Sequence, residues 1–269
     1  MNKSICFNYK YNSDYKERIH LIEESGFSGV FLYSQYNPVE YIDLIGKSSL
    51  KIESLHLPYK KYVDGKCIDS RYVNVLWQDN HESKIYVKEL IEEVKFANEY
   101  NINTVVMHIT GGNTPPQMNE CGIMSIEKVL NTCEKYNITL CLENLRRLDY
   151  LDYVFKKINS DKLKFCFDSG HANSMTKNIQ DFPWDKFGNI LYYLHLNDNN
   201  GDKDQHLIPF NGNINWSELM TVIFKYNKNI GLTLEVRSSE EIRNHYTEFE
   251  YLELCFNSIT KLQSILEGK

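Results

Sequence analysis

Short apolar runs alternate along the chain with longer segments in which apolar residues recur every three or four positions. The apolar runs are nearly continuous, which is typical of parallel strands that are buried on both faces. The longer segments have the period of amphipathic helices. We predict strands over residues 4–7, 29–33, 52–56, 103–108, 138–143, 163–168, 190–196 and 230–236. We predict helices over residues 14–25, 38–46, 82–100, 125–136, 148–158, 216–226 and 240–266, the last as one or two helices.

Three connections depart from this alternation. A long loop passes through Gly65, Ile68 and Trp77, and a turn-rich loop follows the fourth strand. A short helix and an irregular segment with Pro183 and Trp184 separate the sixth and seventh strands.

Eight strand-then-helix units in succession predict an α/β fold, a single (β/α)8 TIM barrel, because eight parallel strands close such a barrel. An open doubly wound sheet is the structural alternative. The first strand is not followed by the glycine-rich GxGxxG turn of dinucleotide-binding sheets, so we expect no nucleotide cofactor. The chain has no linker composition or low-complexity tract, so we expect residues 1–269 to form one domain.

Composition and charge narrow the class of protein. Hydrophobic residues make up 42% and charged residues 25% of the chain, which allows a sizeable core. The formal net charge is −6 and no block of Lys and Arg occurs, which argues against nucleic acid or a membrane surface as the partner. Seven cysteines are scattered without a CxxC pair, and the N-terminus has no apolar leader, so we expect free thiols in the cytoplasm.

Six of the eight apolar runs carry a residue that can bind a metal at their last or next-to-last position. The C-terminal ends of barrel strands meet on one face, and barrel active sites lie there. Imidazole and carboxylate groups are ligands for divalent zinc, manganese and cobalt. Clustered carboxylates also repel one another and are costly to bury, and a divalent cation removes that cost. The six residues are His56, His108, Glu143, Asp168, His195 and Glu235.

Further candidates lie just beyond the strands. His171 follows Asp168 closely enough to turn back toward it, and Asp204 and His206 would join them if their loop folds over the site. Asp198 and Asp202 in that loop are weaker candidates, since loop aspartates usually cap turns. Three arginines could bind an anionic or hydroxylated substrate, although surface ion pairing is an equal alternative for the first two: Arg146, Arg147 and Arg237.

The segments HLPY, VVMH, LCLENL, FCFDSGHAN, HLNDNNGDKDQHL, GNINW and LTLE together resemble the xylose-isomerase-like TIM-barrel superfamily. That group includes sugar-phosphate isomerases and epimerases and also the apurinic/apyrimidinic endonucleases of the endonuclease IV type. The resemblance extends from His56 to Glu235. It implies a (β/α)8 barrel with a divalent metal at the C-terminal face of the strands.

The two branches of this group imply different sites. The isomerase and epimerase branch implies one metal on Glu143, Asp168, His195 and Glu235, with the two glutamates as acid and base. It also implies proton transfer next to a carbonyl through a metal-stabilised enediolate. The endonuclease branch implies three zinc ions on nine ligands, which adds the following five residues: His56, His108, His171, Asp204 and His206.

Departures from the endonuclease pattern favour the first branch. The segments KKYVDG, NLRRLDYL and SGHAN differ from the corresponding endonuclease segments. Against a simple epimerase, the arginine after the seventh strand is replaced by Asp204 and His206. We therefore expect a metal-dependent sugar or sugar-phosphate isomerase or epimerase, with zinc, manganese or cobalt and a small carbohydrate substrate. An endonuclease-like zinc phosphodiesterase is the alternative. His171, Arg237 and Arg146 are the expected substrate contacts, and barrels of this group often form homodimers.

Overall fold

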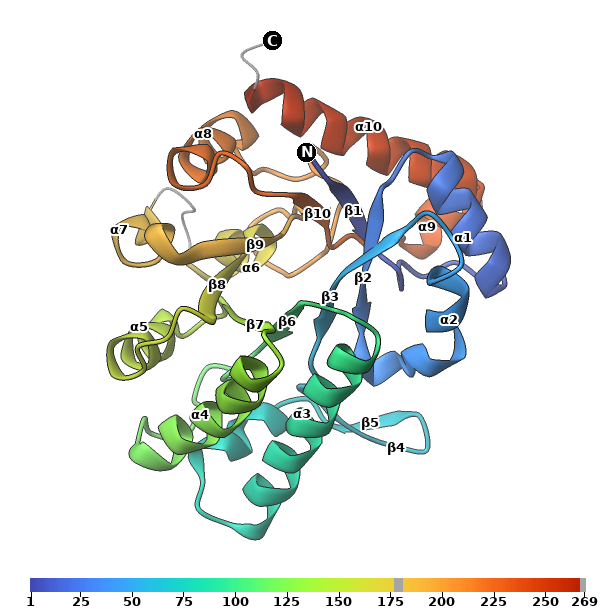
Figure 1. The fold of residues 1–269 in the computed structure, drawn as a ribbon. Helices are drawn as coiled ribbons and strands as arrows, with labels where there is room; N and C mark the ends of the chain where they lie inside the picture. The colour runs from blue at the N-terminus through green and yellow to red at the C-terminus, as the bar shows by residue number, and fades with distance from the viewer. Residues whose placement is uncertain (177–180, 267–269) are drawn as a thin grey trace. The chain divides into compact units, whose positions relative to one another are not determined.

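The computed structural model describes residues 1–176 and 181–266. Strands and helices alternate along the chain, as the colour gradient of Figure 1 shows. The strands of the main sheet are β1 (Lys3–Cys6), β2 (Gly29–Tyr33), β3 (Lys51–His56), β6 (Thr104–Met107), β7 (Thr139–Glu143), β8 (Leu163–Asp168), β9 (Leu191–His195) and β10 (Leu232–Leu234). The helices are α1 (Tyr15–Glu24), α2 (Ile42–Ile45), α3 (His81–Glu99), α4 (Glu120–Lys135), α5 (Leu148–Lys157), α6 (Ser169–Met175), α7 (Trp184–Phe187), α8 (Trp216–Tyr226), α9 (Glu240–His245) and α10 (Glu248–Leu266).

These eight strands form one sheet in the order β10-β1-β2-β3-β6-β7-β8-β9. Taken cyclically, this is the order of the strands along the chain, and it is the topology of a (β/α)8 barrel. A parallel bridge between Leu196 and Leu234 joins the segments at the two ends of that order. The predicted fold class is confirmed. Part of the irregular segment expected before the seventh strand, residues 177–180, lies outside the described residues.

The contacts of the chain divide it into two compact units. Unit 1 comprises residues 1–32, 38–53 and the chain from Phe167 onward, and unit 2 comprises residues 33–37 and 54–166. Unit 1 therefore contains β1, β9 and β10, and unit 2 contains β6 and β7. The expectation of a single domain stays a prediction.

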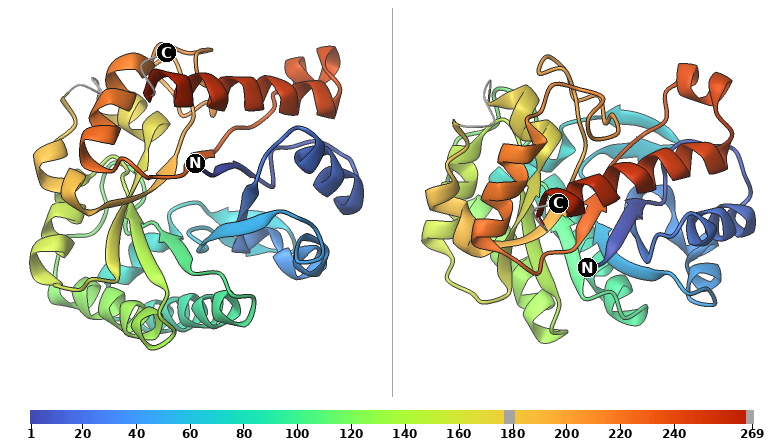
Figure 2. Two further views of the ribbon diagram at one scale, coloured as in Figure 1. Left: turned by 45° about the horizontal axis from the view of Figure 1, so that its top comes forward. Right: turned by 90° about the horizontal axis from the view of Figure 1, so that it is seen from above.

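In unit 1, β1 pairs in parallel with β10 and with β2, so that Ile5 lies beside Leu234 and Val30. Helix α10 packs against α8 and α1, and both contacts can be followed in Figure 2. The buried guanidinium of Arg18 on α1 pairs with Glu248 at the start of α10, with Nε and Oε1 3.4 Å apart. The strand β10 is shorter than predicted, but Glu235 just beyond it still donates its N–H to the carbonyl of Leu196 at 2.9 Å.

In unit 2, β6 pairs with β7 and with β3, while α3 and α4 lie side by side (Figures 1 and 2). The predicted start of the helix at residue 125 was wrong, because α4 begins five residues earlier. The side chain of Asn119 caps it by accepting a hydrogen bond from the N–H of Gly122. Gly122 allows the ring of Trp77 to lie against the helix, since an added Cβ would come within 2.0 Å of that ring.

The long loop expected through residues 65–77 contains regular structure that the sequence prediction missed. Strands β4 (Lys61–Val63) and β5 (Lys66–Asp69) form an antiparallel hairpin, and a 3-10 helix follows at Tyr72–Trp77. Asp64 and Gly65 both have positive φ, 49° and 73°, at the turn of this hairpin. An Asp-Gly pair is a recognised signal for such a turn, so this element was predictable.

Candidate metal centre

Unit 2 brings three of the predicted ligands together. His56 ends β3, His108 directly follows β6 and Glu143 ends β7, so three neighbouring strands of the sheet supply one side chain each. One ligand atom from each of the three residues lies within 4.8 Å of the others. The Nε2 atoms of both imidazoles are 3.3 Å from Oε2 of Glu143, and all three side chains are buried. This donor set is one that a divalent metal accepts.

The hydrogen bonding of His56 fixes which nitrogen faces Glu143. Its Nδ1 lies 2.8 Å from the carbonyl oxygen of Leu57. Because a carbonyl only accepts, Nδ1 carries the hydrogen, and the neutral ring presents the lone pair of Nε2 to the Glu143 carboxylate. A lone pair and a carboxylate oxygen 3.3 Å apart repel each other in a buried site unless a proton or a cation lies between them. Metal-binding histidines commonly have their second nitrogen bonded in this way.

Aromatic rings surround this cluster on the protein side. The ring of Tyr59 lies 4.3 Å from that of His108, and the ring of Tyr33 lies 4.9 Å from that of His56. These contacts restrict the orientation of both imidazoles. Glu143 itself is only 1% exposed, and electrostatic interactions are stronger in such a buried position.

Unit 1 brings together the remaining predicted ligands. Nδ1 of His195, at the end of β9, lies 3.0 Å from Oε2 of Glu235, which follows β10. The ring of Phe31 stacks on His195 with 4.7 Å between ring centres. Asp168, at the end of β8, is completely buried, and its two oxygens accept hydrogen bonds from the His171 N–H and the Asn197 amide. Asn197 was not predicted, because a buried amide in a polar loop has no distinctive pattern.

Asp204 lies between the imidazoles of His171 and His206. Its Oδ2 is 3.4 Å from Nε2 of His171 and 3.2 Å from Nε2 of His206. Nδ1 of His206 lies 2.9 Å from the carbonyl oxygen of Glu235, so Nδ1 again carries the hydrogen and Nε2 faces a carboxylate. Burial by itself would raise the pKa of Asp204. The charges of His171 and His206 and their hydrogen bonds to Asp204 outweigh burial, so the pKa of Asp204 is lowered below its ordinary range.

The loop that carries Asp204 and His206 is organised by Asp198, whose carboxylate is completely buried. Its oxygens accept hydrogen bonds from the backbone N–H groups of Asn199, Phe210 and Ile214 at 2.9, 2.9 and 3.3 Å. They also accept one from Nε1 of Trp216 at 2.8 Å. Asp198 therefore shapes the loop and has no position among the ligands, which agrees with the expected role of loop aspartates. Asp202 is exposed.

The three predicted substrate-binding arginines differ in their surroundings. Arg147 forms a two-pronged ion pair with the carboxylate of Asp149, which is the surface alternative that the sequence left open. Arg146 is exposed in the same loop, and its contact with substrate stays a prediction. Arg237 is half-buried and lines a cavity in unit 1. His171 is buried beside Asp168 and Asp204, and its contact with substrate also stays a prediction.

Cys6, which lies close to Glu235, gives no support for a cysteine nucleophile. Burial, followed by the nearby charge of Glu235, raises the pKa of the Cys6 thiol to about 12. Cys6 is therefore protonated and poorly nucleophilic at neutral pH. All seven cysteines are free, as expected.

Comparison with known proteins identifies the family. The family model described as "Xylose isomerase-like TIM barrel" matches residues 19–254. The chain belongs to this family. The uncharacterized protein MJ1311 of Methanocaldococcus jannaschii is a relative that is 25% identical over 201 residues, which cover 68% of each protein. The probable endonuclease 4 of Mycoplasma mycoides subsp. mycoides SC is 28% identical over 204 residues, covering 65% of this chain and 68% of that protein.

Solved structures support the fold of this xylose isomerase-like barrel over its whole length. D-psicose 3-epimerase from Clostridium cellulolyticum H10, crystallised with D-tagatose, superposes with a TM-score of 0.77 at 14% identity and covers 99% of each chain. The IOLI protein, whose structure contains a zinc atom, superposes with a TM-score of 0.74 at 13% identity and covers 98% of each chain. Within the described residues, no helix combines the length and apolar character needed to cross a bilayer. The cytoplasmic location and the homodimer stay predictions.

Proposed function

We propose that this chain is a divalent-metal-dependent isomerase or epimerase that moves a proton next to the carbonyl group of a small carbohydrate. The observation that carries the proposal is that two buried glutamates each face an imidazole. Oε2 of Glu143, at the end of β7, lies 3.3 Å from Nε2 of His56, and Oε2 of Glu235, just beyond β10, lies 3.0 Å from Nδ1 of His195. Carboxylate and imidazole groups of this kind are ligands that a divalent metal accepts.

The ligands that we propose are those expected from the sequence. We propose that one ion is held by four residues, as the resemblance to the isomerase and epimerase branch implies: Glu143, Asp168, His195 and Glu235. A bound divalent ion would supply Lewis-acid stabilisation of the negative charge that develops on the substrate oxygens. The chemistry of the donor set fits zinc, manganese and cobalt alike.

The protein groups that would move the proton are the carboxylates of Glu143 and Glu235. One would accept the proton from the carbon beside the carbonyl, and the other would return a proton. Both side chains are buried, with exposed fractions of 1% and 3%. Glu235 is oriented by His195, since their closest atoms are 3.0 Å apart, and that ring is in turn held by the stacked Phe31. Such support keeps a proton-transfer group within reach of its target.

Two measurements test this function. Elemental analysis of protein purified without chelator should find at least one zinc, manganese or cobalt per chain. Glu143→Gln and Glu235→Gln should each lower kcat on a responsive ketose by at least about 100-fold, since general acid–base groups contribute that much. Glu99→Gln, an exposed glutamate on α3, is the matched control and should leave kcat unchanged. Full activity of both buried variants, or a metal-free protein, would sink the proposal.

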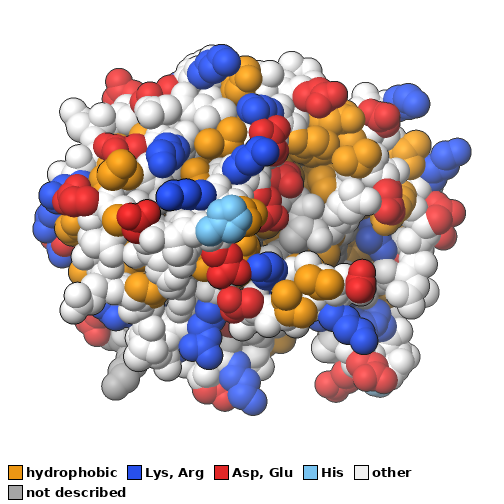
Figure 3. Space-filling model, turned by 90° about the horizontal axis from the view of Figure 1, so that it is seen from below, with side chains coloured by type: hydrophobic (Ala, Val, Ile, Leu, Met, Phe, Trp, Pro, Cys, Tyr) orange, Lys and Arg blue, Asp and Glu red, His pale blue; other side chains and the backbone are white. Residues whose placement is uncertain are grey.

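An endonuclease-like phosphodiesterase is a second candidate, favoured by one specific arrangement. Asp204 contacts both His171 and His206, and these are three of the five additional residues that a multinuclear zinc site would use. Acidic and basic side chains are interspersed on the face drawn in Figure 3, whereas a nucleic-acid site needs clustered positive charge. Three zinc ions per chain together with cleavage of an abasic duplex would establish this alternative. Absence of cleavage with zinc present would remove it.

A further inference from the structure

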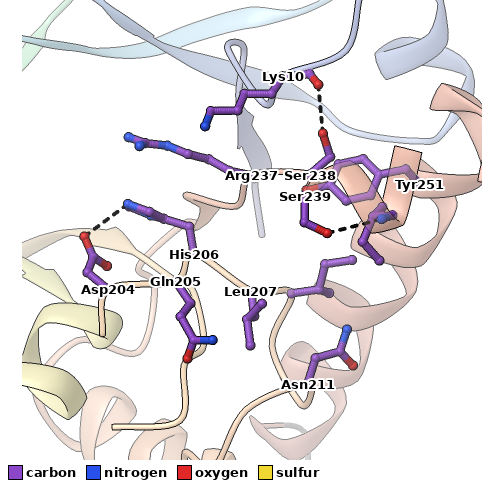
Figure 4. Close-up of a pocket in the computed structure, with 12 residues that line it drawn as sticks. Lys10, Asp204, Gln205, His206, Leu207, Asn211, Arg237, Ser238, Ser239 and Tyr251 are labelled. Carbon is purple, nitrogen blue, oxygen red and sulfur yellow. Dashed lines mark hydrogen bonds and ion pairs between the residues drawn. The ribbon is translucent and has the colours of Figure 1, made fainter. Parts of the chain in front are cut away.

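A cavity of about 300 Å³ opens in unit 1 beside the loop that carries Asp204 and His206. Figure 4 shows that its lining comes from the segment after β1, the loop after β9, the segment after β10 and helix α10. These segments are far apart in the sequence. A cavity of this volume is at the lower end of the range for small-molecule sites.

Two cationic side chains line this cavity. The ammonium group of Lys10 and the guanidinium group of Arg237 extend toward the same side as the imidazole of His206 in Figure 4. The carboxylate of the lining belongs to Asp204, which already contacts the imidazoles of His171 and His206. The two cations outnumber the one carboxylate among the lining residues, although the formal net charge of the chain is −6. Cationic groups that line a concave site attract anions.

The backbone around Lys10 is held in an uncommon conformation. Lys10 has φ of 70°, in the left-handed region that side chains other than Gly, Asn and Asp rarely adopt. The hydroxyl of Ser238 lies 2.9 Å from the carbonyl oxygens of both Tyr9 and Lys10 and donates its hydrogen to them. Strain that the surroundings maintain is a pointer to function. Here the strained residue is the one that brings a cation to the cavity.

Arg237 is tied to the same framework. Its backbone N–H donates to the carbonyl of His206 at 3.0 Å, and the next residue, Ser238, donates its N–H to the carbonyl of Tyr9 at 3.0 Å. The segment after β10 is therefore bonded on one side to the loop after β9 and on the other to the segment after β1. These bonds fix the backbone positions from which the side chains of Lys10 and Arg237 reach the cavity.

We propose that this cavity binds the phosphate group of a phosphorylated short-chain sugar through Lys10 and Arg237. A phosphate monoester carries close to two negative charges at neutral pH, which matches two cations better than the single charge of a carboxylate does. The planar guanidinium offers two parallel N–H donors to phosphate oxygens, and the ammonium adds a compact positive charge. Neither a free sugar nor a neutral polyol would use these charges.

The inference rests on the proposed function and names its substrate class. His206 belongs both to the cavity and to the group of candidate metal ligands in unit 1. A sugar whose phosphate contacts Lys10 and Arg237 would therefore extend its carbon chain toward the imidazole and carboxylate groups. In this arrangement the phosphate would supply binding and orientation at a distance from the reacting carbon.

Calorimetric titration of the protein with its bound metal tests the inference directly. The titrants are D-ribulose 5-phosphate, D-ribulose, D-ribonate and inorganic phosphate. We expect the phosphorylated ketose to bind at least about 10-fold more tightly than the ketose. Lys10→Gln and Arg237→Gln should each lower the affinity for the phosphorylated ketose by roughly 10- to 100-fold, as expected for loss of a hydrogen bond to a charged group. The affinity for D-ribulose should change by a much smaller factor, and metal content should not change.

Lys16→Gln is the matched control, since Lys16 is an exposed lysine on α1, and it should not alter any affinity. Equal affinities for ketose and ketose phosphate would overturn the inference. So would phosphate binding that is insensitive to Lys10 and Arg237, which would indicate binding to the metal instead. Tighter binding of D-ribonate would assign the cavity to sugar acids. Binding of an abasic duplex that depends on both cations would assign it to nucleic acid.

The failure of this inference is distinguishable from the failure of the proposed function. Metal content and proton transfer test the proposed function, and neither depends on the phosphate titration. If the protein binds ketose phosphate through Lys10 and Arg237 but contains no metal, the phosphate site is supported and the proposed isomerase function is rejected. If the protein catalyses metal-dependent proton transfer but does not prefer phosphorylated sugars, the isomerase function is supported and the phosphate site is rejected.

Discussion

The two groups of candidate ligands are built in different ways. In unit 2, His56, His108 and Glu143 lie at or directly after the ends of paired strands, and the parallel register fixes their spacing. In unit 1, Asp204 and His206 lie in a loop whose shape depends on the hydrogen bonds of a buried carboxylate, that of Asp198. The first group is therefore set by the sheet itself and the second by polar contacts within a loop. Changes that spare every ligand should disturb the second group far more readily.

Metal removal gives the largest expected effect, because it should act on both groups. An ion present at about 1,000 times its dissociation constant stabilises the folded protein by about 4 kcal/mol. Dialysis against a chelator should accordingly lower the thermal midpoint by roughly 10 °C, measured by calorimetry at constant pH. The single variants His56→Gln and His206→Gln should each reduce this chelator-sensitive shift. If only His206→Gln reduces it, the group in unit 2 holds no metal and the comparison fails.

Asp198→Ala tests the dependence of the unit 1 group on its loop. The change leaves three backbone N–H groups and the Trp216 indole N–H without their acceptor in a buried position. A single orphaned donor costs about 1–3 kcal/mol, and the loop relaxes in part, so the free energy of unfolding should fall by about 3 kcal/mol in urea titrations.

Asp198→Asn is the control, because its amide oxygen still accepts hydrogen bonds. Asp198→Asn should lower the free energy of unfolding by less than Asp198→Ala does. Metal affinity should fall in Asp198→Ala although no ligand has been changed, and unchanged affinity would show that the loop does not position Asp204 and His206.

Gly122→Ala makes the corresponding test in unit 2, where packing provides the support. The new Cβ would meet the ring of Trp77, whose Nε1 donates to the carbonyl of Ile109, the residue after His108. Overpacking of this kind costs about 1–3 kcal/mol, so we expect a loss of about 2 kcal/mol in the free energy of unfolding. Metal content should be retained, because the paired strands hold the ligands. Loss of metal would mean that this group also depends on its surroundings. Gly46→Ala, where an added Cβ has only ordinary contacts, is the control.

The same contrast explains what the sequence could predict. His56, Glu143, Asp168 and His195 were found because each ends an apolar run, and parallel strands bring such ends together. Asp204 and His206 were found as candidates, but their contacts with His171 and Glu235 depend on a loop that periodicity does not describe. Lys10 was missed because its strand ends without a metal-binding residue, and its role depends on a hydroxyl that lies 228 residues away in the sequence, that of Ser238.

The smallest expected effect is a pH-dependent change in stability at Glu93, a residue outside both groups of candidate ligands. It serves as a reference for the larger effects. Burial, followed by the charge of Glu89, raises the pKa of Glu93 on α3 from 4.5 to about 7. The folded protein therefore binds this proton more tightly than the unfolded chain does. The contribution of Glu93 to stability is fully present below pH 4.5, declines as the pH rises to about 7, and becomes a constant penalty above that value.

Glu93→Gln should consequently raise the free energy of unfolding at pH 8 by about 1 kcal/mol, after allowance for partial solvation, and should have little effect at pH 4.5. Urea titrations at the two pH values measure the difference. Glu92→Gln is the matched control, since Glu92 is exposed and pairs with Lys95 on the surface of the same helix. In a chelator-treated sample, Glu93→Gln should raise the free energy of unfolding at pH 8 by the same amount, because Glu93 is not among the candidate ligands. If the increment disappears with the metal, the pH dependence does not arise from the burial of Glu93 on α3.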